Sequence, residues 1–179
     1  MAKAGLQAEA PGPAGEEGVV AYLVRTLGEA RAAAAALHAA ASRLAMVVRY
    51  REGRAHTCAV EGWVRGATAG RAVELLREFY EVYRRSYPAV IAYAISVSAL
   101  AKDSEVGELL EALERRARSF ESAMAELEAA RPDPSTPCSK TEACEPVEKA
   151  IRKAANVAFA AEDVVAACVE AVRRLSARR

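Results

Sequence analysis

The sequence predicts an all-α protein, an antiparallel up-down-up-down four-helix bundle with long helices. Four segments of the 179-residue chain place apolar residues at alternating spacings of three and four. This spacing keeps one apolar seam on one side of a helix. Each seam is about 30 residues long, so each helix should extend about 45 Å. The stretches between the segments can reverse the chain, as an antiparallel bundle requires.

The seams run from Val20 to Val48, from Val73 to Ala101, from Val106 to Leu127 and from Val147 to Leu175. We therefore expect helices over about 17-51, 69-102, 104-130 and 145-177 in a single helical-bundle domain, 17-179. Residues 1-16, which include a Pro/Gly-rich run, are expected to form a disordered N-terminal tail.

The second helix is expected to be kinked at Pro88, because proline removes a backbone hydrogen bond and either bends a helix or splits it in two. The apolar run after Pro88 is wider than a seam, since Ile91, Tyr93, Ile95 and Leu100 lie off the main line. Such a segment either lies at the centre of the molecule or buries its extra apolar side chains against another subunit.

Helix-end signals support these boundaries. Ser104 is predicted to cap the third helix, with Glu105 and Glu108 near its positive end. Pro146 suits the first turn of the fourth helix. The first two helices are joined by residues 52–68, for which we expect a short helix around Trp63.

Composition narrows the class of protein. The formal net charge is only +1, so the chain as a whole does not attract nucleic acid or acidic partners. The apolar run 89–101 covers roughly 20 Å, too short for a bilayer. No signal peptide is recognisable at the N-terminus. We expect a cytoplasmic protein with no membrane association, no cofactor and no small-molecule substrate. The scarcity of side-chain amides is typical of thermophile proteins.

The two long connections should meet at one end of the bundle and bring four potential metal ligands together, His56, Cys58, Cys138 and Cys144. One His and three Cys suit tetrahedral zinc, although neither spacing is that of a common zinc motif. A disulfide between Cys138 and Cys144 is the interpretation we favour over zinc, and free thiols are the third possibility. Cys168, on the fourth seam, is expected to be a small buried residue.

Charge is uneven along the chain. Residues 43–71 carry six Arg against two Glu, whereas residues 103–131 carry eight acidic residues against four Arg. The arginines around Trp63 are candidates for RNA binding, namely Arg49, Arg51, Arg54, Arg65 and Arg71. The alternative is that these side chains lie on solvated faces and pair with the acidic third helix, within the chain or between copies.

One enzymatic pattern is present. Helical HEPN-type ribonucleases use an Arg followed after a short interval by a His, and Arg31 with His38 meets that spacing, as do Arg49 and Arg51 with His56. Because the chain holds 20 Arg, such a pattern also arises by chance. A structural role for His38 is the simpler interpretation.

Two patches carry a family resemblance. Pro88-Ala89-Val90-Ile91 is followed by Ala99-Leu100-Ala101 and then by Leu109-Leu110-Glu111, and the chain ends on Val172-Arg173-Arg174-Leu175-Ser176. In this the chain resembles the small α-helical subunit of type III-B (Cmr) CRISPR RNA-silencing complexes. It departs from the family at Ile95-Ser96, at Lys102 and in the cysteine-containing connection.

The resemblance implies a non-catalytic structural subunit of a CRISPR ribonucleoprotein effector in antiviral defence. Such a subunit packs side by side with its neighbours and supports binding of guide and target RNA. Arg173 and Arg174 match the family's C-terminal pattern and would contact RNA or a neighbouring subunit. The partners implied are other subunits, copies of the chain itself and RNA. The alternatives are a HEPN-like ribonuclease and a stand-alone helical oligomer or viral structural protein.

Overall fold

The computed structural model describes residues 16–52, 58–139 and 142–178, and these form a helical bundle with one small β-hairpin. The predicted all-α fold class is therefore confirmed. The predicted tail, 1-16, lies outside the described residues apart from Glu16. The main elements are α1 (Glu16–Ser42), β1 (Val48–Glu52), β2 (Cys58–Trp63), α2 (Ala69–Ala101), α3 (Ser104–Ala130) and α4 (Glu145–Ala177).

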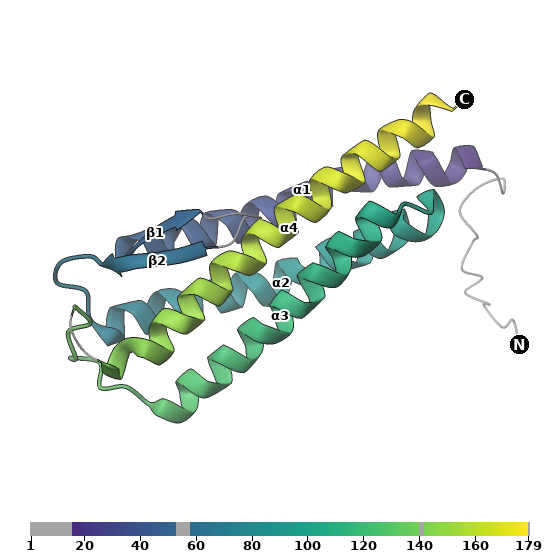
Figure 1. Cartoon of the computed structure of the whole chain (residues 1–179). Helices are drawn as coiled ribbons and strands as arrows, with labels where there is room; N and C mark the ends of the chain where they lie inside the picture. Colours follow the sequence, from purple (N-terminus) through teal and green to yellow (C-terminus); the bar gives the residue numbers. More distant parts are fainter. Residues whose placement is uncertain (1–15, 53–57, 140–141, 179) are drawn as a thin grey trace, which may run out of the picture.

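The four helices lie side by side along one long axis, and in Figure 1 the chain reverses between consecutive helices. The start of α1 and the end of α4 lie at one end of the bundle, and the hairpin lies at the other. Helix α4 contacts α1, α2 and α3. This central position explains why α4 buries residues on more than half of its circumference, many of them Ala or Val. Small side chains allow three neighbours to approach one helix closely.

The core follows the predicted seams closely. Every seam residue of α3 from Val106 to Leu127 is buried, and Phe120 makes an edge-to-face contact with Phe79 of α2 at a centroid distance of 5.2 Å. The structure describes no buried charged or polar residue. None of its helices is long and apolar enough to cross a membrane.

The prediction for the first helix is wrong at its C-terminal end. Helix α1 stops at Ser42 rather than near residue 51, a short 3₁₀ helix follows over Arg43–Met46, and β1 then pairs antiparallel with β2. Leu44 and Val48 are buried as the seam predicts, but Leu44 lies in the 3₁₀ helix and Val48 begins β1. The short helix expected around Trp63 is also wrong, because Trp63 ends β2 and pairs with Val48.

Two residues, Lys102 and Asp103, connect α2 to α3. Lys102 takes a left-handed conformation with φ 49°, which ends α2. Asp103, not the predicted Ser104, caps α3: its carboxylate Oδ1 accepts from the backbone N–H groups of Glu105 (2.9 Å) and Val106 (3.2 Å). Ser104 is the first helical residue, so that prediction was one position late. Pro146 lies in the first turn of α4, as predicted.

Helix α2 runs through Pro88 as a single element, so the chain is not split there. Pro88 is exposed, and the Arg84 carbonyl, which has no proline N–H to accept from, lies on the same outer side of the helix. Solvent can therefore satisfy that carbonyl at low cost. The kink itself stays a prediction.

Candidate functional site

The arginines predicted to bind RNA are divided between the two ends of the bundle. Arg49 and Arg51 lie on β1, Arg65 follows β2, and Arg71 lies in the first turn of α2. Arg173 and Arg174 lie in the last two turns of α4. Because α4 has 33 residues, its two ends are about 50 Å apart. Arg54 lies outside the described residues.

Most of these arginines have an acidic neighbour. Within the described part of the chain the pairs are Arg51 with Glu61 (3.4 Å), Arg71 with Glu74 (3.1 Å), Arg173 with Glu170 (2.8 Å) and Arg174 with Asp103 (3.6 Å). Arg49 and Arg65 are exposed and have no described carboxylate within ion-pair distance. Two of these partners are acids of the same helix, Glu61 lies on the paired strand β2, and Asp103 caps α3. None of these pairs joins a hairpin arginine to the acidic third helix, so the expected pairing with that helix is limited. Exposed pairs of this kind contribute little stability.

The cysteine connection closes one end of the bundle. Cys138 and Cys144 are joined by a disulfide, the pairing favoured over zinc, and with Ala69 and Trp63 they form a small apolar cluster. The connection lies against the start of α2: the N–H groups of Ala69 and Gly70 donate to the carbonyls of Thr136 and Pro134. A Cβ on Gly70 would come within 2.9 Å of Pro134, so only glycine fits there.

The zinc interpretation loses two ligands, because the sulfurs of Cys138 and Cys144 are bonded to each other. His56 and the side chain of Cys58 lie outside the described residues. In the part that is described, no group of three metal-ligating side chains occurs. Cys168 is buried, and burial, followed by the nearby Asp103 carboxylate, raises its pKa to about 12. It is therefore a neutral, unreactive thiol at physiological pH.

His38 is part of a polar contact between α1 and α4. Its Nδ1 lies 2.9 Å from a carboxylate oxygen of Glu162, and about half of the imidazole is exposed. Arg31, two turns earlier on α1, and Glu162 line the same shallow groove of about 540 Å³ with Ala34, Ala35 and Val165. His38 is thus held by a carboxylate while about half of its ring is exposed.

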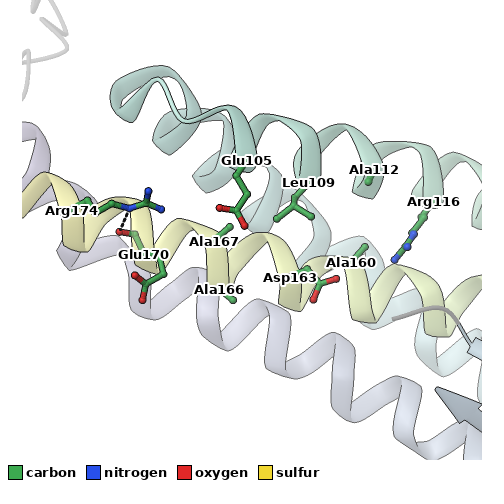
Figure 2. Close-up of a pocket in the computed structure, with 10 residues that line it drawn as sticks. All are labelled: Glu105, Leu109, Ala112, Arg116, Ala160, Asp163, Ala166, Ala167, Glu170 and Arg174. Atoms are coloured by element: carbon green, nitrogen blue, oxygen red, sulfur yellow. Dashed lines mark hydrogen bonds between the residues drawn. The ribbon is translucent and has the colours of Figure 1, made fainter. Parts of the chain in front are cut away.

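Figure 2 shows a second groove, between α3 and α4, with a volume of about 520 Å³. Its floor is formed by Leu109 and alanines of both helices, and its walls carry both signs of charge. Arg174 lies at one end, where its Nε donates to the Glu170 carbonyl at 3.4 Å. Because three carboxylates face two guanidinium groups, this groove has no excess of positive charge to attract a phosphate.

The apolar run after Pro88 divides between core and surface. Tyr93 is buried against α1, where its hydroxyl donates to the Leu23 carbonyl at 2.7 Å. Ile91 is half-buried, whereas Ile95 and Leu100 are 50% and 47% exposed. The proposed surplus of apolar side chains is therefore real for two of the four residues.

A third feature, the outer groove between α2 and α3, was not recognised as a site from the sequence. Tyr80, Tyr83 and Tyr87 stack along α2, with centroids 5.9 and 5.0 Å apart, and Arg84 lies over the Tyr80 ring at 6.0 Å. The Tyr83 hydroxyl donates to Glu121 of α3 at 3.3 Å. Burial raises the pKa of Tyr83 and Tyr87, and nearby glutamates raise them further. The spacing of the tyrosines marked them only as seam residues.

Comparisons of the chain with protein-family models, with curated proteins and with solved structures give no match. Each surface described above is therefore interpreted from its own residues.

Proposed function

We propose that the chain is a non-catalytic structural subunit of a ribonucleoprotein complex, related in role to the small subunit of type III-B CRISPR effectors. The observation that carries this proposal is the C-terminal half of α2. Residues 86–101 contain no charged side chain, yet Ile95 and Leu100 are about half exposed. A charge-free helix face with large exposed aliphatic side chains is typical of a surface that contacts another protein.

The hairpin end of the molecule supports an association with RNA. Arg49 and Arg65 are exposed and without a described acidic neighbour, and Arg51 lies on the same strand as Arg49. Guanidinium groups that are not already paired bind phosphate oxygens at the lowest cost. Trp63, close in sequence to Arg65, is half-buried against the disulfide cluster, so the arginines rather than an aromatic ring carry this end's case for RNA. The RNA-contacting end is thus the hairpin end rather than Arg173 and Arg174.

Salt-dependent RNA binding tests this function. A gel-shift series with a guide–target duplex should show affinity that falls steeply as salt rises, because each phosphate contact releases a counterion. The R49A/R65A double variant should bind at least about tenfold more weakly than the unchanged protein. The slope of log K against log salt should become shallower by about 1.5.

The control is R25A/R115A, which removes the same charge from exposed positions on α1 and α3. It should leave both the affinity and the salt slope close to those of the unchanged protein. An absence of RNA binding at low salt, alone and with partner subunits, contradicts the proposal. So does an equal loss of binding in the control variant.

The contact between His38 and Glu162 favours one second candidate, a HEPN-like ribonuclease. A carboxylate at Nδ1 orients the ring, so that Nε2 can take a proton from an RNA 2′-hydroxyl while Arg31 neutralises the phosphate. H38A should then lower cleavage of a mixed RNA substrate by at least about 100-fold. H56A, at the other histidine that meets the spacing, is measured in parallel. Unchanged cleavage, or no cleavage by the unchanged protein, removes this candidate.

A further inference from the structure

The outer face formed by α2 and α3 has two unlike halves. We call it the α2/α3 face. Near the α2–α3 turn, α2 contributes Ile91 and Ile95, with alanines beside them, and no charge. The neighbouring stretch of α3 is acidic, with Glu111 and Glu114. The register of the two helices places these glutamates beside the isoleucines. At one end of this stretch, Gly107 of α3 lies next to Ser98 of α2. At the other end, burial raises the pKa of the Tyr87 phenol of α2, and Glu114 of α3 is close enough to raise it further.

The half nearer the hairpin is a groove with an aromatic wall. It is lined by the stacked tyrosines and by Met124 of α3. The groove consists of adjoining hollows that have lining residues in common, and it extends along α2 from Pro88 to Arg77. The hollows at Tyr83 and at Tyr80 have volumes of about 320 and 390 Å³. Arg84 and Arg77 lie on the α2 rim of this groove. One half of the face is therefore an apolar ridge beside acids, and the other is an aromatic groove beside arginines.

We propose that the α2/α3 face binds a second copy of the chain in an antiparallel pair whose two-fold axis passes near Pro88. In an isologous contact, a residue above the axis meets one the same distance below it on the other copy. Ile95 lies seven residues after Pro88 and meets the groove at Tyr80 and Glu81, about 10 Å before Pro88. Arg84, four residues before Pro88, lies 3.9 Å from Glu81 of its own helix, an exposed pair, and meets the stretch of the second copy that carries Glu114.

The charges of the groove select a second copy rather than RNA. Its arginines, Arg77, Arg84 and Arg118, are balanced by Glu81, Glu121 and Glu128. Such a surface has no net attraction for a phosphate backbone, so the pairing depends on individual contacts, namely Ile95 in the aromatic groove and Arg84 beside Glu114 of the other copy. The face from residue 77 to 99 is about 30 Å long and two helices wide, on the order of 600 Å² per copy. That is at the low end for a specific dimer.

This inference rests on the proposed function, because it assigns the partner that covers the exposed half of α2. A two-fold contact closes at two copies, so it predicts a dimer and not an open filament of this chain alone. Other subunits of a complex then meet the pair at its remaining faces.

Light scattering coupled to size exclusion, over a range of protein concentrations, tests the pairing. The unchanged protein should show a mass approaching twice its 19.0 kDa. I95E should be a monomer, because it places a carboxylate against the Tyr80 ring and beside Glu81 of the other copy. R84E and E114R should each raise the dimer Kd by at least about tenfold, since each change occurs twice in a symmetric pair. The R84E/E114R double variant should recover most of the affinity.

The matched control is R25E/E29R, a charge swap on the exposed face of α1, which should leave the dimer unchanged. Circular dichroism melts check that each variant is folded, which we expect because Ile95 and Arg84 are exposed and Glu114 is only half-buried. A monomeric unchanged protein at high concentration, an I95E variant that still dimerises, or a double variant without recovery overturns the proposal. RNA binding by monomeric I95E would separate a failure of this interface from a failure of the RNA-associated function.

Discussion

Tyr93 shows how one residue of the apolar run after Pro88 joins the core. Its ring is buried between α2 and α1, and its hydroxyl donates to the Leu23 carbonyl at 2.7 Å. Burial, and next the nearby Cys168, raise the pKa of Tyr93 to about 12, while Arg31 acts in the opposite direction. The phenol is thus a neutral donor over the whole physiological range.

The variant Tyr93→Phe should lower the free energy of unfolding at pH 8 by about 1 kcal/mol, because it removes one buried hydrogen bond. The folded pKa of about 12 lies above the unfolded value of 10.0. The stabilisation from Tyr93 is therefore complete below pH 10 and is lost as the pH rises through 12. Urea titrations of both proteins at pH 8, 10 and 11.5 should show the difference shrinking with pH. Tyr22→Phe, at an exposed position, is the control. A difference that stays constant to pH 11.5 contradicts this account.

At the scale of elements, the turn between α2 and α3 depends on Asp103. This carboxylate caps two N–H groups of α3 and lies 3.6 Å from Arg174 at the end of α4. One side chain therefore ties together the ends of α3 and α4. Ser104, the cap predicted from sequence, is exposed and already helical.

Replacement of Asp103 by Ala should lower the free energy of unfolding by about 1 kcal/mol, chiefly through the lost cap. The ion pair with Arg174 adds little, because the guanidinium is exposed. Ser104→Ala should change stability by less than about 0.5 kcal/mol, since an exposed position outside the cap has little to lose. Thermal or urea unfolding of the two variants measures the contrast. Equal destabilisation by both variants would show that the cap is shared or misassigned.

At the scale of the whole molecule, the two ends of the bundle differ in their residues, and the α2/α3 face differs from the other sides. The hairpin end carries the exposed arginines and the disulfide. The opposite end gathers the start of α1, the α2–α3 turn and the end of α4 (Figure 1). The α2/α3 face lies between them. An antiparallel pair through that face places the two hairpin ends at opposite extremities, so each copy would present its arginines to RNA separately.

The apolar spacing was informative over most of the chain because burial in a bundle recurs with the helical period. The predicted bounds of α3 and α4 agree with the structure at both ends. Those of α2 agree at its start and are one residue too long at its C-terminal end. The apolar spacing failed after Ser42, where Leu44 and Val48 continue the spacing by coincidence. A competing signal was present: from Val48 to Arg51, apolar and charged residues alternate with the period of a strand.

The candidate surfaces were less accessible to sequence reasoning. From the sequence, the arginines near Trp63 and those near the C-terminus were grouped as one set of RNA-binding candidates. In the structure they lie at opposite ends of the bundle, separated by the length of the 33-residue helix α4. The stacked tyrosines read as seam residues, because spacing alone does not show how far α2 and α3 diverge on their outer side. His38 read as structural, since its contact with Glu162 joins residues more than 120 positions apart.

The sequence by itself determined the helical class, the three later helices and the apolar half of α2, because these depend on local periodicity and on the absence of charge. Only the tertiary structure decided which seam residues form the core, where α1 gives way to a hairpin and which of the described arginines have a described acidic neighbour. Those properties depend on the central position of α4 and on contacts between distant parts of the chain. The local spacing of apolar residues predicts neither of them.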